Sequence, residues 1–369
     1  MRFLVITSAP TLKTENGYEA YGPYVYEMDI WFKYAKEITI LCPTSYPTDF
    51  FIKPFENQSI NIIKAPYLET KTITGVLSLI WKIPFILFII TREMIRADHI
   101  HLRCPGNISL LGAVIQVFFP KKKKTAKYAG NWDPKSKQPL SYRFQKWILS
   151  NTILTKKIKV LVYGEWPGQT KNILPFFTAS YWKSEMEEVI QREYDKKLIF
   201  LFIGTLSKGK RPLLTLQIIH ELLKRGINCK LDVYGDGEQK EILIDFIKKN
   251  NLHTAIELHG NKNKEVVKAQ LQKAHFLILP SVSEGWPKVI AEAMFWGCMP
   301  ISNSVSCIPW MLGEDERGVL IPSDLDEIVN TLISEVNDTT RLQNKSNAAV
   351  KWSRKYTLDL FENKIKQIM

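Results

Sequence analysis

Cysteine is scarce in this sequence, and its spacing follows no recognisable pattern. The chain of 369 residues has five cysteines, an odd number, and no two of them form a C-x-x-C pair. This argues against a framework of disulfide bonds in a small secreted fold. We interpret the cysteines as reduced thiols of a cytoplasmic protein.

Long apolar runs are missing as well. Residues 1–6 contain too few apolar side chains for a signal peptide. The most hydrophobic stretch, residues 76–90, is 15 residues long and contains Lys82 and Pro84, which is short for a membrane span. We expect a buried or interfacial helix there. The protein is expected to be cytoplasmic, and peripheral binding to the inner face of the membrane stays open.

Several binding signatures are also absent. No zinc-finger spacing, RNP-like aromatic motif or basic heptad region is present, so no nucleic acid partner is expected. The loop after the first predicted strand lacks G-x-G-x-x-G, which argues against an ordinary dinucleotide site. The only D-x-D, Asp324 to Asp326, is interpreted as the cap and first turn of a helix. No metal site and no cofactor are expected.

Positive charge is present in excess, and it belongs to the first half of the chain. The formal net charge is +13; residues 1–180 contain 24 Lys and Arg and 12 Asp and Glu, whereas residues 181–369 contain 26 and 25. Such a basic half can serve solubility, bind an anionic membrane surface or bind an anionic acceptor. The sequence leaves these three open. The lysines at 121–124 are interpreted as a solvated turn.

The length and the order of elements predict an α/β protein with two domains. A chain of 369 residues exceeds what one hydrophobic core usually supports, and the loop-like composition of residues 164–168 indicates a boundary near residue 172. Strands are predicted at residues 3–7, 38–42, 60–65, 99–103, 125–129, 159–163, 172–178, 198–203, 229–234, 256–259, 276–279, 299–302 and 319–321. Helices are predicted at residues 24–36, 76–96, 109–119, 142–150, 181–194, 213–224, 239–250, 264–273, 287–296 and 325–337. This alternation is typical of parallel sheets covered by helices.

One stretch of the second half has the features of a ligand site. The apolar run 275–279 is typical of a strand that is buried on both faces of a parallel sheet. Pro287 then suits the first turn of a helix, and Gly297 marks the end of that helix. The loop between them lies at the carboxyl end of a strand, where open α/β sheets bind their ligands.

Two carboxylates frame the start of this helix. Glu292 is the only charged residue in residues 289–313, and so apolar a helix should be buried. A buried carboxylate needs donors, which must come from elsewhere in the chain or from a ligand. Glu284 precedes the helix, so the two side chains offer hydroxyl acceptors beside a helix N-terminus that favours an anion.

The whole pattern, PS-x-x-EGWP-x-V-I-x-EAM-x-x-G-x-x-P over residues 280–300, resembles the donor-site signature of the retaining GT-B glycosyltransferases of family 4. The segment from Gly204 to Lys210 is similar to that family's glycine–lysine segment, and residues 233–238 are similar to its next strand and turn. The resemblance implies two doubly wound Rossmann-like domains that face each other across a cleft. Here they would be residues 1–172 on the acceptor side and residues 173–350 on the donor side, with a helix in 351–369 crossing back to the first domain.

The resemblance also implies roles for single residues. Glu284 and Lys210 would be catalytic, with Glu284 at the transferred sugar and Lys210 at the diphosphate, while Glu292 would contact the ribose hydroxyls. Thr205 stands where the family commonly has an arginine, and Lys208 or Arg211 is left to supply that charge. The other donor-binding candidates are Gly22, Gly204, Gly235, Asn261, Gly285, Trp286, Pro287, Lys288 and Val289.

Further candidates lie at the ligand-binding edge of the first predicted sheet. Tyr24 follows Gly22 at the start of a helix, Arg103 ends one predicted strand, and Asp133 follows the next strand. Because ligands bind at the carboxyl ends of such strands, Tyr24, Arg103 and Asp133 are interpreted as acceptor-side residues. His99 and His101 alternate onto one face of a strand, and we expect them to be packed.

The resemblance therefore implies a retaining glycosyltransferase, which we expect to be independent of a metal ion. Its co-substrate would be a nucleotide-diphosphate sugar, and its acceptor a glycan or lipid-linked saccharide of polysaccharide biosynthesis. Two other interpretations stay open: a GT-B-type nucleotide-sugar epimerase, and an inactive nucleotide-sugar-binding subunit. The sequence does not specify the nucleobase, the sugar, the acceptor, the linkage or the oligomeric state.

Overall fold

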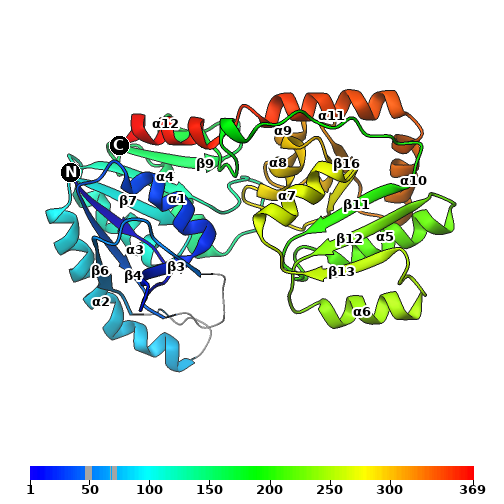
Figure 1. The fold of residues 1–369 in the computed structure, drawn as a ribbon. Coiled ribbons are helices and arrows are strands. Elements are labelled where there is room, and N and C mark those ends of the chain that lie inside the picture. The colour runs from blue at the N-terminus through cyan, green and yellow to red at the C-terminus, as the bar shows by residue number, and fades with distance from the viewer. Residues whose placement is uncertain (46–51, 67, 69–72) are drawn as a thin grey trace. The chain divides into compact units, whose positions relative to one another are not determined.

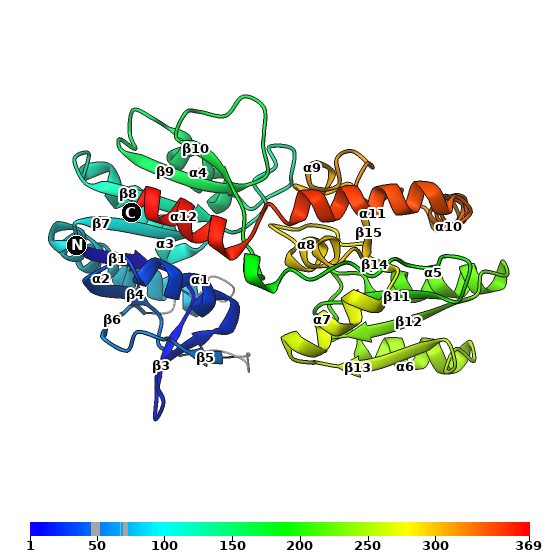
Figure 2. The same cartoon turned by 45° about the horizontal axis from the view of Figure 1, so that its top comes forward.

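The structure is a computed structural model that describes residues 1–45, 52–66, 68 and 73–369. Its chain divides into two compact units (Figures 1 and 2), each of which is described by itself. Unit 1 consists of Met1–Phe177 and Phe361–Met369, and unit 2 of Thr178–Leu360. The division falls after residue 177 where the sequence indicated 172, and the C-terminal segment that joins unit 1 begins at residue 361 where the sequence indicated 351.

Unit 1 is built on a seven-stranded sheet of strand order β10-β9-β8-β7-β1-β4-β6, in which all neighbours are parallel. Its strands are β1 (Arg2–Ile6), β4 (Glu37–Cys42), β6 (Ile60–Lys64), β7 (His99–Cys104), β8 (Lys123–Tyr128), β9 (Ile158–Tyr163) and β10 (Ile173–Phe176). In β1 every residue after Arg2 is buried. The apolar runs of the sequence thus form strands that are covered on both faces.

The helices of this unit follow the strands. They are α1 (Gly22–Phe32), α2 (Ile73–Arg96), α3 (Asn107–Ile115), α4 (Leu140–Ser150), the 3-10 helix η1 (Gln116–Phe118) and α12 (Leu358–Ile368). Helix α3 packs against both α2 and α4, so these three helices form one layer on the sheet. Among the described residues, no helix combines the length and the apolar character that crossing a membrane requires.

A small antiparallel sheet in unit 1 was not predicted. Strands β2 (Thr11–Thr14), β3 (Gly17–Tyr21) and β5 (Ile52–Pro54) pair in the order β2-β3-β5. The turn between the first two contains Glu15 and Asn16, and Gly17 follows at φ +100°, a conformation that favours glycine. The long loop after β1 is therefore an ordered hairpin that leads into α1.

Unit 2 is built on a second parallel sheet, of strand order β13-β12-β11-β14-β15-β16. Its strands are β11 (Leu198–Ile203), β12 (Cys229–Tyr234), β13 (Ile256–Gly260), β14 (Phe276–Leu279), β15 (Met299–Asn303) and β16 (Val319–Ile321). Its helices are α5 (Pro212–Lys224), α6 (Lys240–Lys249), α7 (Lys264–Lys273), α8 (Lys288–Phe295), α9 (Ile308–Leu312), α10 (Leu325–Val336) and α11 (Thr339–Ser353). The predicted α/β class with two Rossmann-like halves is confirmed, although α9 and α11 were not predicted.

The polar helix predicted at residues 181–194 is wrong. Only the 3-10 turn η2 (Lys183–Glu185) forms there. The buried Arg192 explains the difference, because its guanidinium donates to the carbonyl oxygens of Ala274 at 2.6 Å and Trp296 at 2.7 Å. These bonds hold the segment extended against the body of unit 2, and a helix would turn the arginine away from them.

The solvated turn predicted for the lysines at 121–124 forms only in part, since Lys121 is exposed in the turn before β8 but the next residues leave that turn. Lys123 and Lys124 begin β8, and the side chain of Lys124 is buried with its Nζ donating to the carbonyl oxygen of Gln116 at 3.1 Å. Burial lowers the pKa of Lys124 to about 8. The Nζ of Lys122 donates to the carbonyl oxygens of Ile95 at 2.8 Å and Ala97 at 2.5 Å. Lys122 therefore connects the residues before β8 to the carboxyl end of α2.

The two histidines of β7 are packed, as predicted. Thr125 Oγ1 lies 2.9 Å from Nε2 of His99 and 2.8 Å from Nδ1 of His101, and both rings contact Phe3. Burial lowers the pKa of His99 to about 3 and places the pKa of His101 well below its ordinary value of 6.5. Both rings are therefore neutral in the folded protein at neutral pH.

This burial predicts a loss of stability in mild acid. Between pH 6.5 and the lowered folded pKa, the unfolded chain binds protons that the folded chain does not, so the free energy of unfolding falls as the pH falls. From pH 7 to pH 5.5 each histidine should contribute a loss of about 1 kcal/mol. Urea titrations of the wild type and of His99→Gln/His101→Gln should show a flatter pH dependence for the variant, and equal slopes would contradict the assignment.

Candidate functional site

The site in unit 2 lies where the order of its strands reverses. From β11 the chain builds outward through β12 and β13, and it then resumes at β14 on the other side of β11. The loops after β11 and β14 therefore leave the same edge of the sheet and diverge in opposite directions. Open α/β sheets bind ligands at such a point.

The two predicted catalytic residues meet here. Lys210, in the loop after β11, places its Nζ 2.6 Å from Oε1 of Glu284, in the loop after β14. The side chain of Glu284 is only 7% exposed, whereas that of Lys210 is 31% exposed. The pair therefore holds a buried carboxylate beneath a cation that solvent and a ligand can still reach.

Backbone contacts fix the two loops to one another and to the sheet. The N–H of Val282 donates to the carbonyl oxygen of Gly209 at 2.9 Å, which joins the two loops directly. Ser306 accepts from the N–H of Glu284 at 3.2 Å and donates to its carbonyl oxygen. Cys307 Sγ donates to the carbonyl oxygen of Gly285 at 3.1 Å. The position of Glu284 is thus set by its main chain as well as by Lys210.

Glycines allow the strand ends to approach closely. Gly204 has φ +156° and Gly235 has φ +140°, both in the region that favours glycine. A Cβ on Gly235 would lie 1.9 Å from the carbonyl oxygen of Gly204, so no other residue fits there. The N–H of Gly204 donates to the carbonyl oxygen of Tyr234 at 2.9 Å. The two predicted donor-binding glycines therefore lie side by side.

The loop after β11 contains three further residues that the sequence predicted to bind the donor. Thr205 and Lys208 are exposed, and Arg211 is half-buried with φ +55° directly before α5. The side chains of these three make no hydrogen bond or ion pair with another residue that the structure describes. The N–H of Lys208 donates to Oε1 of Glu238 at 3.2 Å. Two cations besides Lys210 thus remain available to an anion.

The loop after β14 leads into the amino end of α8. Pro287 is the cap residue, and no side chain caps the first turn. Trp286 is buried, while Gly285, Lys288 and Val289 are half-buried. A helix start without a side-chain cap keeps backbone N–H groups that an anionic group can use.

Glu292 lies one turn further along α8 and has a donor from within the protein. Its Oε1 accepts a hydrogen bond from the hydroxyl of Ser180. The helix buries Ile290, Ala293 and Met294 on its inner face, and Glu292 is half-buried beside them. The donor required by the apolar surroundings is therefore a hydroxyl from a distant part of the chain.

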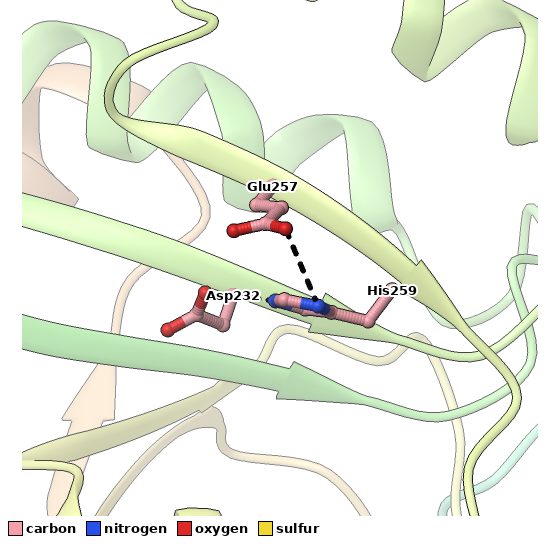
Figure 3. A group of neighbouring side chains, drawn as sticks. All are labelled: Asp232, Glu257 and His259. Atoms are coloured by element: carbon pink, nitrogen blue, oxygen red, sulfur yellow. Dashed lines mark hydrogen bonds and ion pairs between the residues drawn. The ribbon is translucent and has the colours of Figure 1, made fainter.

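At the end of β13, Asn261 is exposed and follows Gly260, which has φ +68°. Close to it, His259 lies between two carboxylates (Figure 3): its Nε2 is 2.9 Å from Asp232 Oδ1, and its Nδ1 is 3.7 Å from Glu257 Oε1. Within the described part of the chain, this is the one group of three side chains with suitable spacing for a metal ion. Lys230 already pairs with Asp232 Oδ2 at 2.8 Å, so a cation of the protein balances the buried carboxylate.

The predicted D-x-D serves as a helix cap. Asp324 is the cap residue of α10, and its Oδ1 accepts from the N–H of Glu327 at 3.1 Å. Asp326 pairs with Arg225 at 2.7 Å on the surface. Both carboxylates therefore have the structural roles that the sequence indicated.

In unit 1, the acceptor-side candidate Arg103 turns toward the protein. Its guanidinium donates to Glu27 on α1 and lies 5.4 Å from the ring of Tyr24, which is buried. Lys127, fully buried at the end of β8, donates to the other oxygen of Glu27 at 2.8 Å. Gly22 is buried in the first turn of α1, without a side-chain cap. These residues form a charged cluster at the carboxyl end of the sheet with one cation in excess.

Asp133 shapes its own loop. Its N–H donates to Asn131 Oδ1 at 2.9 Å, and its Oδ1 accepts from the N–H of Lys135 at 2.8 Å. The carboxylate of Asp133, which the sequence predicted to be an acceptor-side group, thus stabilises a turn within its own loop.

Sequence reasoning missed Ser180, Ser306, Glu27 and Lys127. Each is close to its partner only because the fold brings distant segments together; Ser180 and Glu292, for example, are 112 residues apart. A serine carries no local signal of such a contact. Lys127 could have been noticed as a charge in an otherwise buried strand, where a partner is required.

Comparison with known proteins supports the sequence resemblance for the second unit. Residues 184–352 match the family model described as glycosyl transferases group 1. The resemblance to these enzymes that the sequence indicated is thereby confirmed for that part of the chain.

Two curated relatives illustrate the match. A putative colanic acid biosynthesis glycosyltransferase, WcaL of Escherichia coli, is 28% identical over 133 residues, which is 34% of this chain and 33% of the relative. A Campylobacter jejuni N-acetyl-D-galactosaminyltransferase, whose name specifies a diphosphate undecaprenol-linked acceptor, is 32% identical over 137 residues, 37% of each chain. The match thus spans about a third of the length of these relatives.

Solved structures share the fold over the whole chain. Sucrose-phosphate synthase of Thermosynechococcus elongatus has a TM-score of 0.67 at 15% identity and covers 100% of this chain and 98% of its own. HepE of Anabaena, in complex with UDP and glucose, has a TM-score of 0.68 at 12% identity with the same coverage. The fold is therefore of the GT-B type.

The contact between Lys210 and Glu284 predicts a measurable coupling in the free protein. Either single change, Lys210→Met or Glu284→Gln, should cost about 1.5–3 kcal/mol of unfolding free energy, because it removes a charged hydrogen-bond partner. The double variant should lose less than the sum of the two, by roughly 1 kcal/mol or more. The exposed pair Arg225 and Asp326, changed in the same way, is the control and should couple by less than about 1 kcal/mol. Additive effects at Lys210 and Glu284 would contradict the pair.

Proposed function

We propose that the chain is a retaining glycosyltransferase of family 4, which transfers a sugar from a nucleotide-diphosphate donor to a glycan or a lipid-linked saccharide without a metal ion. The observation that carries the proposal is the meeting of Lys210 and Glu284 at the reversal point of the unit 2 sheet. Both belong to the motif that resembles the donor site, and both lie on loops that such folds use for ligands.

The donor diphosphate would be held by positive charge from the protein. Lys210 is partly exposed, and Lys208 and Arg211 stand in the same loop. The uncapped start of α8 adds backbone N–H groups from the other side. Together they would stabilise the negative charge that develops on the leaving diphosphate, which is the task a divalent cation performs elsewhere.

The sugar and the ribose would be bound by the two carboxylates. Ser306 fixes the main chain of Glu284 and Lys210 bonds one of its carboxylate oxygens, so the carboxylate would be held in place to accept from a hydroxyl of the transferred sugar. Glu292 already accepts one hydroxyl hydrogen, from Ser180, and would accept the ribose hydroxyls in the same manner. Binding the ribose would thus explain why the apolar helix α8 contains a carboxylate.

Transfer with retention would proceed on one face of the sugar. The bond between the anomeric carbon and the diphosphate oxygen breaks, the acceptor oxygen bonds to the same face of that carbon, and the acceptor's proton passes to the departing diphosphate. The leaving group then acts as the base, so no separate general base is needed. Lys210 would stabilise the diphosphate until that proton arrives.

The acceptor is proposed from the relatives. The names of the Campylobacter and Escherichia proteins refer to a lipid-linked saccharide and to the biosynthesis of an extracellular polysaccharide. An acceptor of that class is assembled at the cytoplasmic leaflet, so we propose a cytoplasmic enzyme. The five cysteines are buried and form no disulfide bond, which is in keeping with a reducing compartment.

The function is tested by transfer itself. Each of several nucleotide-diphosphate sugars is incubated with the protein and a lipid-linked or free saccharide, and the products are separated. Formation of a glycoside with the donor's anomeric configuration supports the proposal. An isomerised nucleotide sugar without a glycoside would indicate an epimerase, and binding without any turnover would indicate an inactive binding subunit.

The use of protein cations predicts donor binding in EDTA. A nucleoside diphosphate at about 100 times its dissociation constant should stabilise the fold by roughly 2.7 kcal/mol in the absence of any metal ion. The variant Lys210→Met should lose most of this gain, whereas Lys230→Met, outside the proposed phosphate site, should retain it. Thermal unfolding with UDP and GDP measures both. Stabilisation that vanishes in EDTA and returns with magnesium or manganese would contradict the metal-free site.

A further inference from the structure

Helix α2 of unit 1 exposes aromatic side chains along one side. Its inner face buries Ile86, Ile90 and Met94. The outer face carries Trp81, Phe85 and Phe88, which are 83%, 54% and 65% exposed. The spacing of four and then three residues puts these three rings in one row along the helix. Residues 80–90 therefore present apolar side chains both toward the core and toward solvent.

Helix α4 repeats this arrangement. Leu140, Phe144 and Trp147 have the same helical spacing and are 77%, 44% and 55% exposed. The rings of Phe144 and Trp147 stack at 5.7 Å between their centroids. Because α3 lies between α2 and α4 in one layer, the outer sides of the two helices belong to one surface of unit 1. We call the five rings of Trp81, Phe85, Phe88, Phe144 and Trp147 the aromatic stripe.

The aromatic stripe distinguishes unit 1 from unit 2. Among the described residues, every exposed aromatic side chain lies in unit 1. The exposed large apolar residues of unit 2 are all aliphatic: Ile190, Ile242, Ile244, Val266 and Val282. A gathering of this kind on one surface marks an interaction site more often than isolated apolar residues do.

The same part of the chain contains all of the excess positive charge. Residues 73–159 have 16 Lys and Arg against three Asp and Glu, a net charge of +13, which equals the formal net charge of the whole chain. The other residues are therefore balanced. Lys124 and Lys127 are buried and the side chain of Arg103 is only 12% exposed, which leaves 13 cations against three acidic residues for the surface of this segment. A surface with such an excess of positive charge repels a second copy of itself and attracts an anionic one.

Several of these cations lie at the ends of the two helices. Arg92 and Arg96 are exposed in the last turns of α2, and both pair with the buried Glu93, so the three residues together have one positive charge in excess. The bonds from Lys122 to Ile95 and Ala97 fix the neighbouring Lys121 beside that helix end. The N–H of Lys124 donates to the carbonyl oxygen of Lys157 at 3.3 Å, so the exposed Lys156 and Lys157 after α4 lie along the same edge. We call Arg92, Arg96, Lys121, Lys156 and Lys157 the basic rim.

We propose that this surface of unit 1 docks on a bilayer that contains anionic lipid, with the aromatic stripe in the interfacial region and the basic rim against the headgroups. Aromatic and apolar residues on one face with lysine and arginine beside them are the pattern of helices that lie in a membrane interface. Each lysine or arginine near an anionic leaflet strengthens binding about fivefold. This proposal goes beyond sugar transfer and does not depend on it.

The two components predict two separable losses of binding. Sedimentation with vesicles of phosphatidylcholine and phosphatidylglycerol should show strong binding at low salt, weaker binding at 1 M salt, and little binding to pure phosphatidylcholine. Lys121→Gln/Lys156→Gln should reduce partition about 25-fold at low salt. Trp81→Ser/Phe85→Ser/Phe88→Ser should reduce it by at least about tenfold at every salt concentration, because apolar burial is not screened.

The matched control is Ile242→Ser/Ile244→Ser, which changes exposed apolar residues of unit 2 and should leave partition unchanged. Thermal stabilisation by UDP or GDP, measured on each variant, reports on the donor site and should be the same as in the wild type. A failure of donor binding with intact vesicle binding would thus affect only the proposed function.

Three results would overturn the inference. The first is no binding to anionic vesicles at low salt. The second is binding that the aromatic variant retains in full, since the stripe would then have no part in it. The third is a dimer of the wild type in light scattering without lipid that the same aromatic variant converts to a monomer, because the stripe would then be covered by a second copy of the chain.

Discussion

The reversal of strand order between β11 and β14 is the constraint on which the site in unit 2 depends. Two neighbouring parallel strands end at the same edge, and their following loops depart in opposite directions, so the side chains of both loops meet above that edge. Lys210 and Glu284 satisfy each other there, which removes the cost of a buried lone carboxylate. The close approach of Gly204 and Gly235, the two bonds from Ser306 and the contact of Gly209 with Val282 all maintain this geometry.

The two units differ in the balance between acidic and basic residues and in how many of their cations are paired. In unit 2 the acidic and basic residues are nearly balanced, and the loop after β11 contains two cations, Lys208 and Arg211, whose side chains pair with no other described residue. In unit 1 the buried Arg103 and Lys127 pair with Glu27 and the buried Lys124 donates to a backbone carbonyl oxygen, while most of the other cations of residues 73–159 are exposed. Charge that is not required by the fold thus marks the surface that we assign to the membrane.

The sequence predicted the strands and helices of unit 2 well, because apolar runs and helical periodicity are local signals; residues 264–273 and 276–279 agree with α7 and β14 without any difference. It failed where a distant partner decides the conformation. Arg192 holds residues 181–194 extended through carbonyl groups that are about 80 or more residues away in sequence. Lys122 is bound by the carbonyl oxygens of Ile95 and Ala97, which are 27 and 25 residues away. The order of strands in a sheet also gives no local signal in the sequence. The resemblance therefore implied the roles of Lys210 and Glu284, but not the contact between them, which requires β11 and β14 to be neighbours. Ser180 and Ser306 could not be found at all.

The central claim is that a nucleotide-diphosphate sugar binds over the loops after β11 and β14, and amide hydrogen exchange measures this directly. In EDTA, with UDP or GDP at saturating concentration, exchange should slow at residues 204–211 and 281–289, where backbone N–H groups and Lys210 would hold the phosphates. Residues 324–336, which cap and form α10 on another part of unit 2, should exchange as in the free protein. Protection that spares both loops, while the nucleotide demonstrably binds, would contradict the account.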